Sequence, residues 1–193
     1  MAFPIGVEPV PDVVRRLAAG RSVRAVWRNE LGGLTFQIDG GAEYVKTGPG
    51  GFGAEADRLA WAAPYVVVPR VLGVGADWLH TAGLAGHSAV HPNWVARPRQ
   101  AARAIGAGLR VLHDRLPVDS CPWVRTDFAD APPIDRLVVC HGDACAPNTM
   151  IDDDGRCCGH VDLDALGVAD RWADLAVATM SLGWNYPGPA CED

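Results

Sequence analysis

The sequence predicts an α+β protein in which strands dominate the first part of the chain and helices dominate the second. Short strand-like segments separated by glycine-containing turns fill the front of the chain, and the longest helical pattern begins only near residue 99. The character changes around residues 80–84, so we expect two lobes, spanning 1–81 and 82–193, with a hinge between them.

The first lobe is expected to hold two helices and five strands. Its first helix has Asp12 as the N-cap and Gly20 as the stop. Two adjacent glycines, Gly32 and Gly33, predict a tight turn between the first two strands. In chain order, the expected elements are helix 12–19, strands 23–27, 34–38 and 43–47, helix 55–63, and strands 65–68 and 77–81.

The second lobe is expected to be mainly helical. Its clearest helix runs from about 99 to 116, because four apolar residues spaced three or four apart share one face and Pro117 follows. These residues are Ile105, Leu109, Leu112 and Leu116. Beyond them, the order of expected elements is a loop at 119–136, strands at 136–140 and 158–163, and a helix at 172–182.

The charge balance argues against a general affinity for nucleic acids. The formal net charge is −6, whereas nucleic-acid binding favours a basic face. Residues 1–120 carry a net +3 and residues 121–193 a net −9, which suits a nucleotide on the first part and metal ions or a cationic substrate on the second. An acidic surface that only aids solubility explains the same numbers equally well.

Targeting signals are also missing from the sequence pattern. No apolar run reaches the roughly 18 to 20 residues that span a bilayer, and the N-terminus lacks the basic and apolar regions of a secretory signal. We therefore expect a cytoplasmic protein without a membrane partner.

Six cysteines without a C-x-x-C pair predict reduced thiols. The alternative is a zinc site, but the spacing of the available ligands matches no standard zinc module. Those ligands are Cys140, His141, Cys145, Cys158 and His160.

An apolar strand that ends in His141-Gly142-Asp143 carries the main chemical signal. Asn148 follows Asp143 by five residues, and Asp162 ends the next apolar strand. Phosphoryl transfer needs a carboxylate beside the attacking hydroxyl and oxygen ligands that hold Mg²⁺ on the phosphates. Kinases use this spacing, so Asp143 is the candidate catalytic residue, and Asn148 and Asp162 are the candidate metal ligands.

Lysine usage points independently to a nucleotide. Lys46 is the only lysine in the chain and lies on the expected third strand, where kinases place the lysine that contacts the α and β phosphates. Glu55, which opens the next helix, is its candidate partner. The turn containing Gly32 and Gly33, up to Thr35, is a candidate phosphate cover. The alternative is an exposed strand lysine without a partner.

Nine stretches of the sequence occur in an order that is typical of one enzyme family. They are NELGGLTF (29–36), YVKT (44–47), AEADRLAW (54–61), TAGLAG (81–86), LHDRLP (112–117), CPW (121–123), VVCHGDACAPN (138–148), HVDL (160–163) and GVADRWADLA (167–176). Together they resemble the aminoglycoside 3′-phosphotransferase family, and the last three stretches are specific to it rather than to kinases at large.

The resemblance implies a protein-kinase-like fold with an antiparallel-sheet N-lobe, a mainly helical C-lobe and MgATP between them. Asp143 would receive the proton of a sugar hydroxyl, while Asn148 and Asp162 would hold Mg²⁺. The implied substrate is a small cationic amino sugar, the implied outcome is antibiotic resistance, and no protein partner is implied.

The same resemblance assigns the nucleotide contacts. Lys46 would bind the α and β phosphates, with Glu55 orienting it. Tyr44 would stack on the adenine, and the backbone near Thr81 and Ala82 would bond its edge. A tyrosine that only packs in the sheet is the alternative reading of Tyr44, because strands favour aromatic residues.

Several other residues have structural roles by resemblance. Those expected to tie the segment after Asp162 to the following helix are Asp170, Arg171 and Asp174. Among the histidines, His141 is expected to anchor its loop by hydrogen bonds, whereas His113 and His160 are expected to pack in a helix and a strand.

Three departures from the family leave the substrate open. The stretch from Asp119 to Val138 is shorter than in relatives, and Asp164-Ala165 stand where the family commonly has Gly-Arg. The chain ends at Asp193, which leads us to expect a truncated C-lobe without the acidic tail of relatives. The alternatives are therefore a kinase of another small hydroxylated or amino-sugar metabolite, and a truncated non-catalytic remnant.

Overall fold

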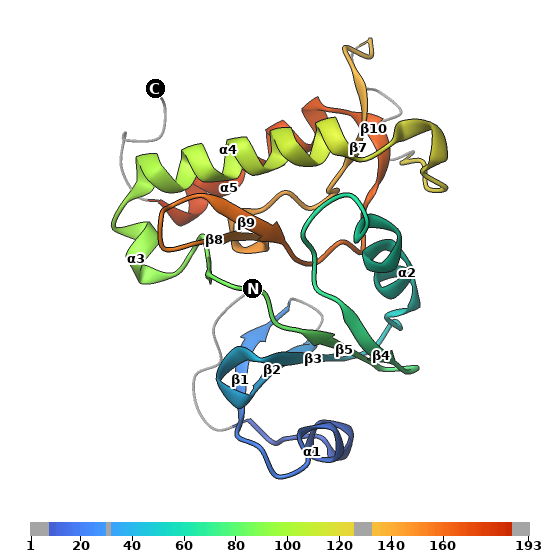
Figure 1. The fold of residues 1–193 in the computed structure, drawn as a ribbon, viewed down its shortest axis with the longest axis vertical. Helices are drawn as coiled ribbons and strands as arrows, with labels where there is room; N and C mark the ends of the chain where they lie inside the picture. The colour runs from blue at the N-terminus through green and yellow to red at the C-terminus, as the bar shows by residue number, and fades with distance from the viewer. Residues whose placement is uncertain (1–7, 30–31, 126–132, 187–193) are drawn as a thin grey trace. The chain divides into compact units, whose positions relative to one another are not determined.

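A computed structural model describes residues 8–29, 32–125 and 133–186 (Figure 1). The predicted turn residues 30–31, part of the predicted loop, Cys191 and the end of the chain lie outside the described residues.

The chain divides into two compact units. Unit 1 comprises residues up to Trp61 together with Pro69–Leu84, and unit 2 comprises Ala62–Val68 together with residues from Ala85 onward. The boundary near residue 84 lies close to the predicted hinge, but residues 62–68 belong to unit 2, whereas the sequence analysis placed them in the first lobe.

Unit 1 contains an antiparallel sheet with the strand order β1-β2-β3-β5-β4. Because side chains alternate along a strand, Phe36, Ile38 and Val45 share the buried face and pack against Val14 and Ala18 of the first helix. The elements are α1 Asp12–Ala18, β1 Val23–Arg28, β2 Leu34–Ile38, a 3₁₀ turn Asp39–Gly41, β3 Glu43–Thr47, α2 Gly53–Ala62, β4 Val71–Val74 and β5 Trp78–Ala82.

Several features differ from the sequence predictions for the first lobe, including β4, which was not predicted. Pro11 is the N-cap of α1, so Asp12 is its first helical residue, where its charge still complements the helix dipole. The predicted strand at 65–68 is not formed. Val66 and Val68 are buried in unit 2 instead, and the Val67 carbonyl accepts a hydrogen bond from the His160 N–H. The apolar run is therefore core packing rather than a strand.

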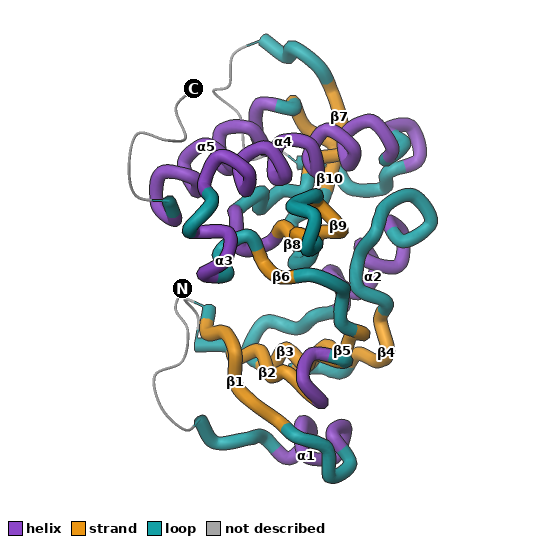
Figure 2. Tube along the Cα trace, turned by 60° about the vertical axis from the view of Figure 1, so that its left-hand side comes forward, coloured by secondary structure: helices purple, strands orange, loops and turns teal. Residues whose placement is uncertain are grey.

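Unit 2 places two long helices beside short antiparallel strands. Figures 1 and 2 both show α4 and α5 side by side, with β8 and β9 next to α4. The two sheets have the orders β10-β7 and β6-β8-β9. The elements are β6 His87–Ser88, α3 Pro92–Val95, α4 Pro98–Arg115, β7 Leu137–Cys140, β8 Thr149–Ile151, β9 Cys157–His160, β10 Gly167–Asp170 and α5 Trp172–Asn185, with 3₁₀ turns at Val118–Ser120 and Ala146–Asn148.

The predicted helix of unit 2 is confirmed as α4. Its apolar stripe, including Ile105, Leu109 and Leu112, is buried, and Pro98 lies in its first turn. Leu116, which is extended and precedes a proline, caps its C-terminal end. None of the helices in the described part of the chain is both long enough and apolar enough to cross a membrane.

Candidate active site

The His141-Gly142-Asp143 turn directly follows β7. Gly142 has a φ of 89°, a left-handed conformation that favours glycine. A side chain there would also collide with the carbonyl oxygen of Ala165 and the guanidinium of Arg125. The turn therefore needs a glycine, both for its backbone angle and for the close approach of the chain at residue 165.

Asp174, in the first turn of α5, anchors this turn from behind. Its carboxylate accepts hydrogen bonds from the backbone N–H of His141 at 2.7 Å and of Gly142 at 2.9 Å. The His113 Nε2 atom of α4 lies 2.8 Å from the same carboxylate. Burial raises the pKa of Asp174, but the hydrogen bond with His113, the electrostatic interaction with His141 and the two backbone hydrogen bonds outweigh it and lower the pKa overall.

These contacts correct one sequence expectation. Asp174 holds the turn before Asp143, not the segment after Asp162, and His113 is its hydrogen-bond partner rather than only a packing residue. The expectation for Asp170 is confirmed, because its carboxylate accepts a bond from the Trp172 N–H at 2.9 Å and so ties the segment after Asp162 to the start of α5.

Arg171 of the same segment also has a structural contact. Its guanidinium lies 2.6 Å from the Asp135 carboxylate, which joins the start of α5 to the residues before β7. This partner precedes Asp143 in the chain, so Arg171, like Asp174, does not tie the segment after Asp162.

His141 connects two loops of the site. Its Nδ1 atom accepts a bond from the Asp143 N–H at 3.3 Å, which places the ring proton on Nε2, and Nε2 then donates to the Val161 carbonyl at 3.0 Å. The ring also contacts the His160 ring edge-on, with centroids 5.6 Å apart. The expectation that His141 is a hydrogen-bonded anchor is confirmed.

Asn148 lies at the end of a 3₁₀ turn that folds back toward Asp143. Its Nδ2 atom donates to the Asp143 carbonyl at 3.0 Å and to the Asp143 carboxylate at 3.1 Å. Its own carbonyl accepts a bond from the Val161 N–H at 3.0 Å. The tight turn thus brings together two side chains that are five residues apart in the sequence.

Asp162 is the third residue that the sequence predicted for this site. It follows the end of β9 with a φ of 65°, so the chain turns sharply at this residue. Burial raises the pKa of the Cys145 thiol to about 12, and a hydrogen bond with Asp143 and the charges of Asp143 and Asp162 contribute to the rise. The Asp143 carboxylate thus bonds near this buried thiol, and the Asp162 carboxylate lies in the same unit, one residue after Val161, whose N–H donates to the Asn148 backbone carbonyl.

Lys46 and Glu55 form an ion pair within unit 1. The distance from Lys46 Nζ to Glu55 Oε1 is 2.7 Å, and the glutamate side chain is 4% exposed. Lys46 pairs across the sheet with Thr35 and with Leu79. The alternative of an exposed lysine without a partner is therefore wrong.

The glycine turn of unit 1 is held by Asn29. Gly32 has a φ of 82°, and the Gly33 N–H donates to the Asn29 side chain at 2.7 Å. An added Cβ at Gly33 would meet the same asparagine and the Thr47 carbonyl. Gly33 is therefore closely surrounded, whereas a Cβ at Gly32 would meet nothing within 4 Å.

Tyr44 and Thr81 face each other across β3 and β5. The Tyr44 hydroxyl accepts a bond from the Gln37 side chain at 3.2 Å. The Ala82 N–H donates to the Arg70 carbonyl at 2.9 Å, so this donor is already used within the sheet. Recognition of an adenine edge at this position would need other backbone groups.

A second cluster of charged and polar side chains in unit 1, which is partly buried, has no counterpart in the sequence predictions. Glu43 binds Arg21 through both oxygens, at 2.7 and 2.8 Å, and lies 2.7 Å from His80 Nε2. The Arg21 hydrogen bonds, assisted by those of His80, lower the pKa of Glu43 to about 2. This cluster joins the residue after α1 to two strands.

The metal-ligating side chains that cluster within the described residues do not match the zinc alternative. They are His113, Cys140 and Asp174, and the five described cysteines are free thiols. His160 is buried beside His141, and burial lowers its pKa to about 4. The packing role expected for His160 fits this position.

Comparisons with known proteins identify relatives of this chain. The model of the phosphotransferase enzyme family matches residues 119–190. An aminoglycoside 3′-phosphotransferase from Streptomyces fradiae is 35% identical over 173 residues, covering 66% of this chain and 63% of that protein. Another, from Streptomyces ribosidificus, is 33% identical over 182 residues, covering 70% of this chain and 68% of that protein. The chain thus spans about two thirds of the length of these relatives.

A solved structure shows the same fold. Aminoglycoside phosphotransferase APH(3'')-Id from Streptomyces rimosus is 26% identical, with a TM-score of 0.68 over 87% of this chain and 80% of that one. The structure of that protein in complex with ADP and streptomycin has a TM-score of 0.61 over 79% of this chain and 78% of that one. The predicted protein-kinase-like α+β fold is confirmed.

Proposed function

Because this chain belongs to the aminoglycoside phosphotransferase family, we propose that it transfers the γ-phosphate of ATP to a hydroxyl of an aminoglycoside antibiotic and so confers resistance. The observation that carries the proposal is the hydrogen-bonded pair of Asp143 and Asn148, joined through the Asn148 carbonyl to the loop that ends in Asp162. This is the grouping of oxygen ligands that phosphoryl transfer requires.

Asp143 would receive the proton of the attacking hydroxyl. The sugar oxygen forms a bond to the γ-phosphorus, the bond from that phosphorus to the bridging oxygen breaks, and ADP leaves. The proton passes to the Asp143 carboxylate and then to solvent. The Asn148 side-chain amide donates to the Asp143 carboxylate at 3.1 Å, and the Asp143 N–H donates to His141 Nδ1 at 3.3 Å. The first bond orients the carboxylate, and the second holds the backbone of the same residue.

Mg²⁺ fits the donor set at this position. The Asn148 Nδ2 atom is used by Asp143, which leaves its Oδ1 atom for a cation, and the Asp162 carboxylate is a hard oxygen ligand of the kind that Mg²⁺ prefers. When bound, the ion would neutralise charge on the phosphates. Asn148 and Asp162 are therefore the residues that we propose as its protein ligands.

Lys46 is the proposed contact of the α and β phosphates. Its ammonium is held at 2.7 Å by a nearly buried glutamate, which fixes its position before a nucleotide arrives. Gly32, Gly33 and Thr35 are the proposed cover of the phosphates, and the pairing of Thr35 with Lys46 across the sheet supports this place. Tyr44 and the backbone near Thr81 remain the proposed adenine contacts.

The substrate proposal rests on charge and on the relatives. Residues 121–193 carry a net −9, and a polycationic sugar gains roughly 1 kcal/mol from each solvated carboxylate that it meets. The Streptomyces rimosus relative has been solved with ADP and streptomycin. We therefore propose a cationic amino sugar as the phosphate acceptor and a cytoplasmic location, where ATP is available.

The experiment is an ADP-release assay with MgATP and a panel that includes kanamycin and streptomycin. The Asp143→Asn variant keeps the side-chain shape but removes the proton acceptor, and we expect the rate to fall by about 10²–10⁴-fold. Asp119→Asn makes the same chemical change at an exposed position and should leave the rate unchanged. Equal rates for wild type and Asp143→Asn would rule out the mechanism.

A second candidate is a kinase of another small hydroxylated metabolite. It is favoured by Asp164-Ala165, which replace the usual Gly-Arg, while the Arg125 guanidinium donates to the Ala165 carbonyl at 3.2 Å. ADP release with an uncharged polyol, but not with any aminoglycoside of the panel, would select this candidate. The non-catalytic alternative would instead show neither ADP release nor a thermal shift with MgATP.

A further inference from the structure

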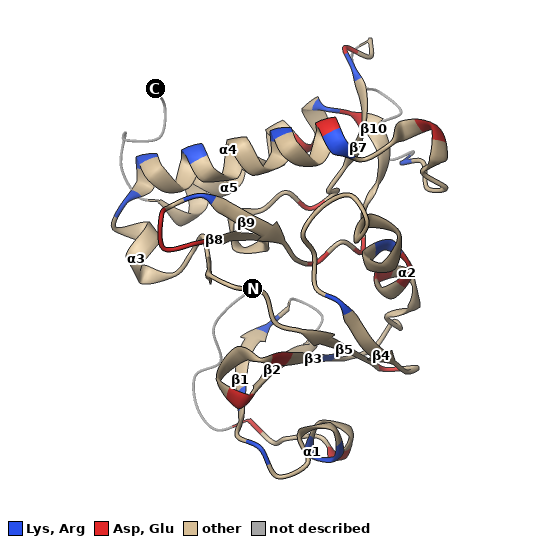
Figure 3. Cartoon of the chain, viewed as in Figure 1, with Lys and Arg blue, Asp and Glu red and all other residues tan. Residues whose placement is uncertain are grey.

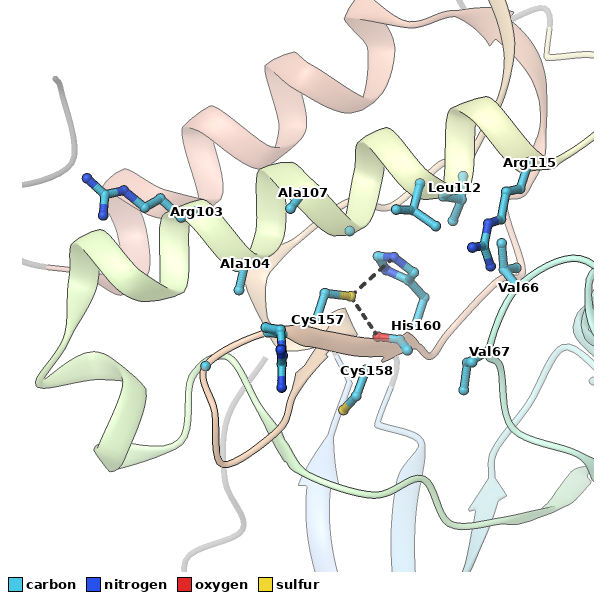
Figure 4. Close-up of a pocket in the computed structure, with 15 residues that line it drawn as sticks. Val66, Val67, Arg103, Ala104, Ala107, Leu112, Arg115, Cys157, Cys158 and His160 are labelled. Carbon is cyan, nitrogen blue, oxygen red and sulfur yellow. Dashed lines mark hydrogen bonds between the residues drawn. The ribbon is translucent and has the colours of Figure 1, made fainter.

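A pocket within unit 2 lies apart from the proposed catalytic group. It has a volume of about 540 Å³ and opens between α4 and β9, with Val66 and Val67 closing one side (Figure 4). Small-molecule sites in proteins commonly have volumes of about 300–1,000 Å³. The proposed catalytic and metal-binding residues do not line this pocket.

Most of the pocket wall is apolar. From α4 it is lined by Ala104, Ala107, Val111 and Leu112, and residues of β9 line it as well. Ala107 and Val111 are exposed, although both are apolar residues on a long helix. An apolar ring or chain bound here would remove this surface from water, which is the main source of affinity in such sites.

Positive charge surrounds the apolar wall. Arg103 and Arg115 of α4 and Arg156 before β9 line the pocket, and Figure 3 shows basic positions along α4. Arg156 is paired with Asp154. Neither Arg103 nor Arg115 makes a hydrogen bond or ion pair with the residues that the structure describes. In Figure 4 the Arg115 side chain turns toward Val66, whereas Arg103 extends away from the labelled wall residues.

One buried polar atom of the wall also lacks a partner. His160 is 4% exposed, and its Nδ1 atom forms no hydrogen bond within the described residues. Its Nε2 atom lies 3.7 Å from the Cys157 thiol, as the dashed line in Figure 4 shows. A buried polar atom without a partner is unfavourable, so a polar group on a ligand would gain by reaching it.

We propose that this pocket is a second ligand site, which binds a small amphiphilic anion. The apolar ring or chain of the ligand lies against Ala107, Val111 and Val67, and its carboxylate, sulfonate or phosphate faces the unpaired Arg115. The planar guanidinium of arginine matches these anions with two parallel hydrogen bonds. The charge of the rim therefore selects an anion, whereas the proposed phosphate acceptor is a cation.

The test uses two dyes with the same ring system. 8-Anilino-1-naphthalenesulfonate carries a sulfonate, and N-phenyl-1-naphthylamine lacks it, and both gain fluorescence in apolar surroundings. Titration of the full chain should show saturable binding of both dyes. Ala107→Trp adds an indole at the pocket wall and should abolish the binding of both. These measurements require no phosphotransfer, so they stand or fall independently of the proposed function.

Charge variants identify the role of the arginine. Arg115→Gln should weaken binding of the sulfonate dye about two- to fivefold, which is the upper part of the range for one exposed charge contact, and leave the neutral dye unchanged. Arg110→Gln is the matched control, because Arg110 is on the same helix but outside this pocket, and it should leave both dyes unchanged.

The opposite results overturn the proposal. Binding that survives in Ala107→Trp, with circular dichroism showing a folded chain, would place the dyes elsewhere. The exposed side chains of α5 are one such place, and loss of the signal in Trp184→Ser would identify it. The claim that Arg115 binds an anionic group would be refuted if Arg115→Gln lowered the affinity for both dyes equally. It would also be refuted if Arg115→Gln and Arg110→Gln had the same effect on the affinity for the sulfonate dye. If Ala107→Trp does not fold, the two arginine variants decide the question alone.

Discussion

Replacement of Asp174 by asparagine should destabilise unit 2 strongly, although the two side chains have nearly the same shape. The carboxylate is 1% exposed and accepts bonds from the backbone of His141 and Gly142, with His113 Nε2 also in hydrogen-bond range. Asparagine has one acceptor oxygen, and its amide nitrogen would face a backbone N–H. At least one of these hydrogen bonds is therefore lost.

The magnitude follows from the number and type of bonds. A hydrogen bond to a charged group contributes about 1.5–3 kcal/mol, and the bonds that remain are weakened by the loss of charge. We expect the free energy of unfolding to fall by about 2–4 kcal/mol. Because the pKa of Asp174 is lowered in the folded protein, its stabilising contribution is present at neutral pH and is lost as the pH falls below about 4.

Urea titration and native-state hydrogen exchange of α4 amides measure this change. Asp119→Asn is the control, because Asp119 is exposed in the same unit and the same substitution there should change stability by less than about 0.5 kcal/mol. The reasoning would be refuted by an Asp174→Asn variant as stable as wild type at pH 7. A loss that is the same for both variants would also contradict it.

Three further predictions concern other parts of the chain. Glu43→Gln should remove a contribution of about 1–2 kcal/mol, reduced from the full linkage value because the Arg21 pair contacts solvent. Because the pKa of Glu43 is lowered to about 2, the carboxylate stabilises the fold above pH 4.5, and this contribution is lost as the pH falls toward 2. Between these pH values, the free energy of unfolding, measured by urea titration, should therefore depend less on pH in the variant than in the wild type. Gly142→Ala should cost at least about 2 kcal/mol in urea titrations, because the left-handed backbone is strained for alanine. Asp143→Asn should lower the pKa of Cys145, now raised to about 12, and mass spectrometry of metal-free protein should show faster iodoacetamide labelling of that thiol.

The predictions that succeeded from sequence depend on local patterns. The apolar stripe of α4 repeats every three or four residues, and the alternation along β2 and β3 has the period of a strand. The pairing of Asp143 with Asn148 also belongs to this class, because a 3₁₀ turn between them brings the side chains together within five residues.

The features that sequence missed depend on distant partners. Asp174 reaches His113, which is 61 residues earlier, and Glu43 reaches His80, which is 37 residues later. The apolar segment 65–68 has the composition of a strand but packs in unit 2. Composition alone does not distinguish a strand from an irregular segment in the core, because apolar side chains are removed from water in both cases.

The sequence by itself determined the family and the kinase-like fold, and it supplied the candidate residues for the proposed chemistry, because motif spacing is a property of the chain. Only the tertiary structure decided what holds those residues in place and where a second pocket opens. Both depend on side chains from separate segments that meet around Asp174 and around β9. Contacts of this kind arise when apolar surfaces are buried together, and no short stretch of sequence encodes them.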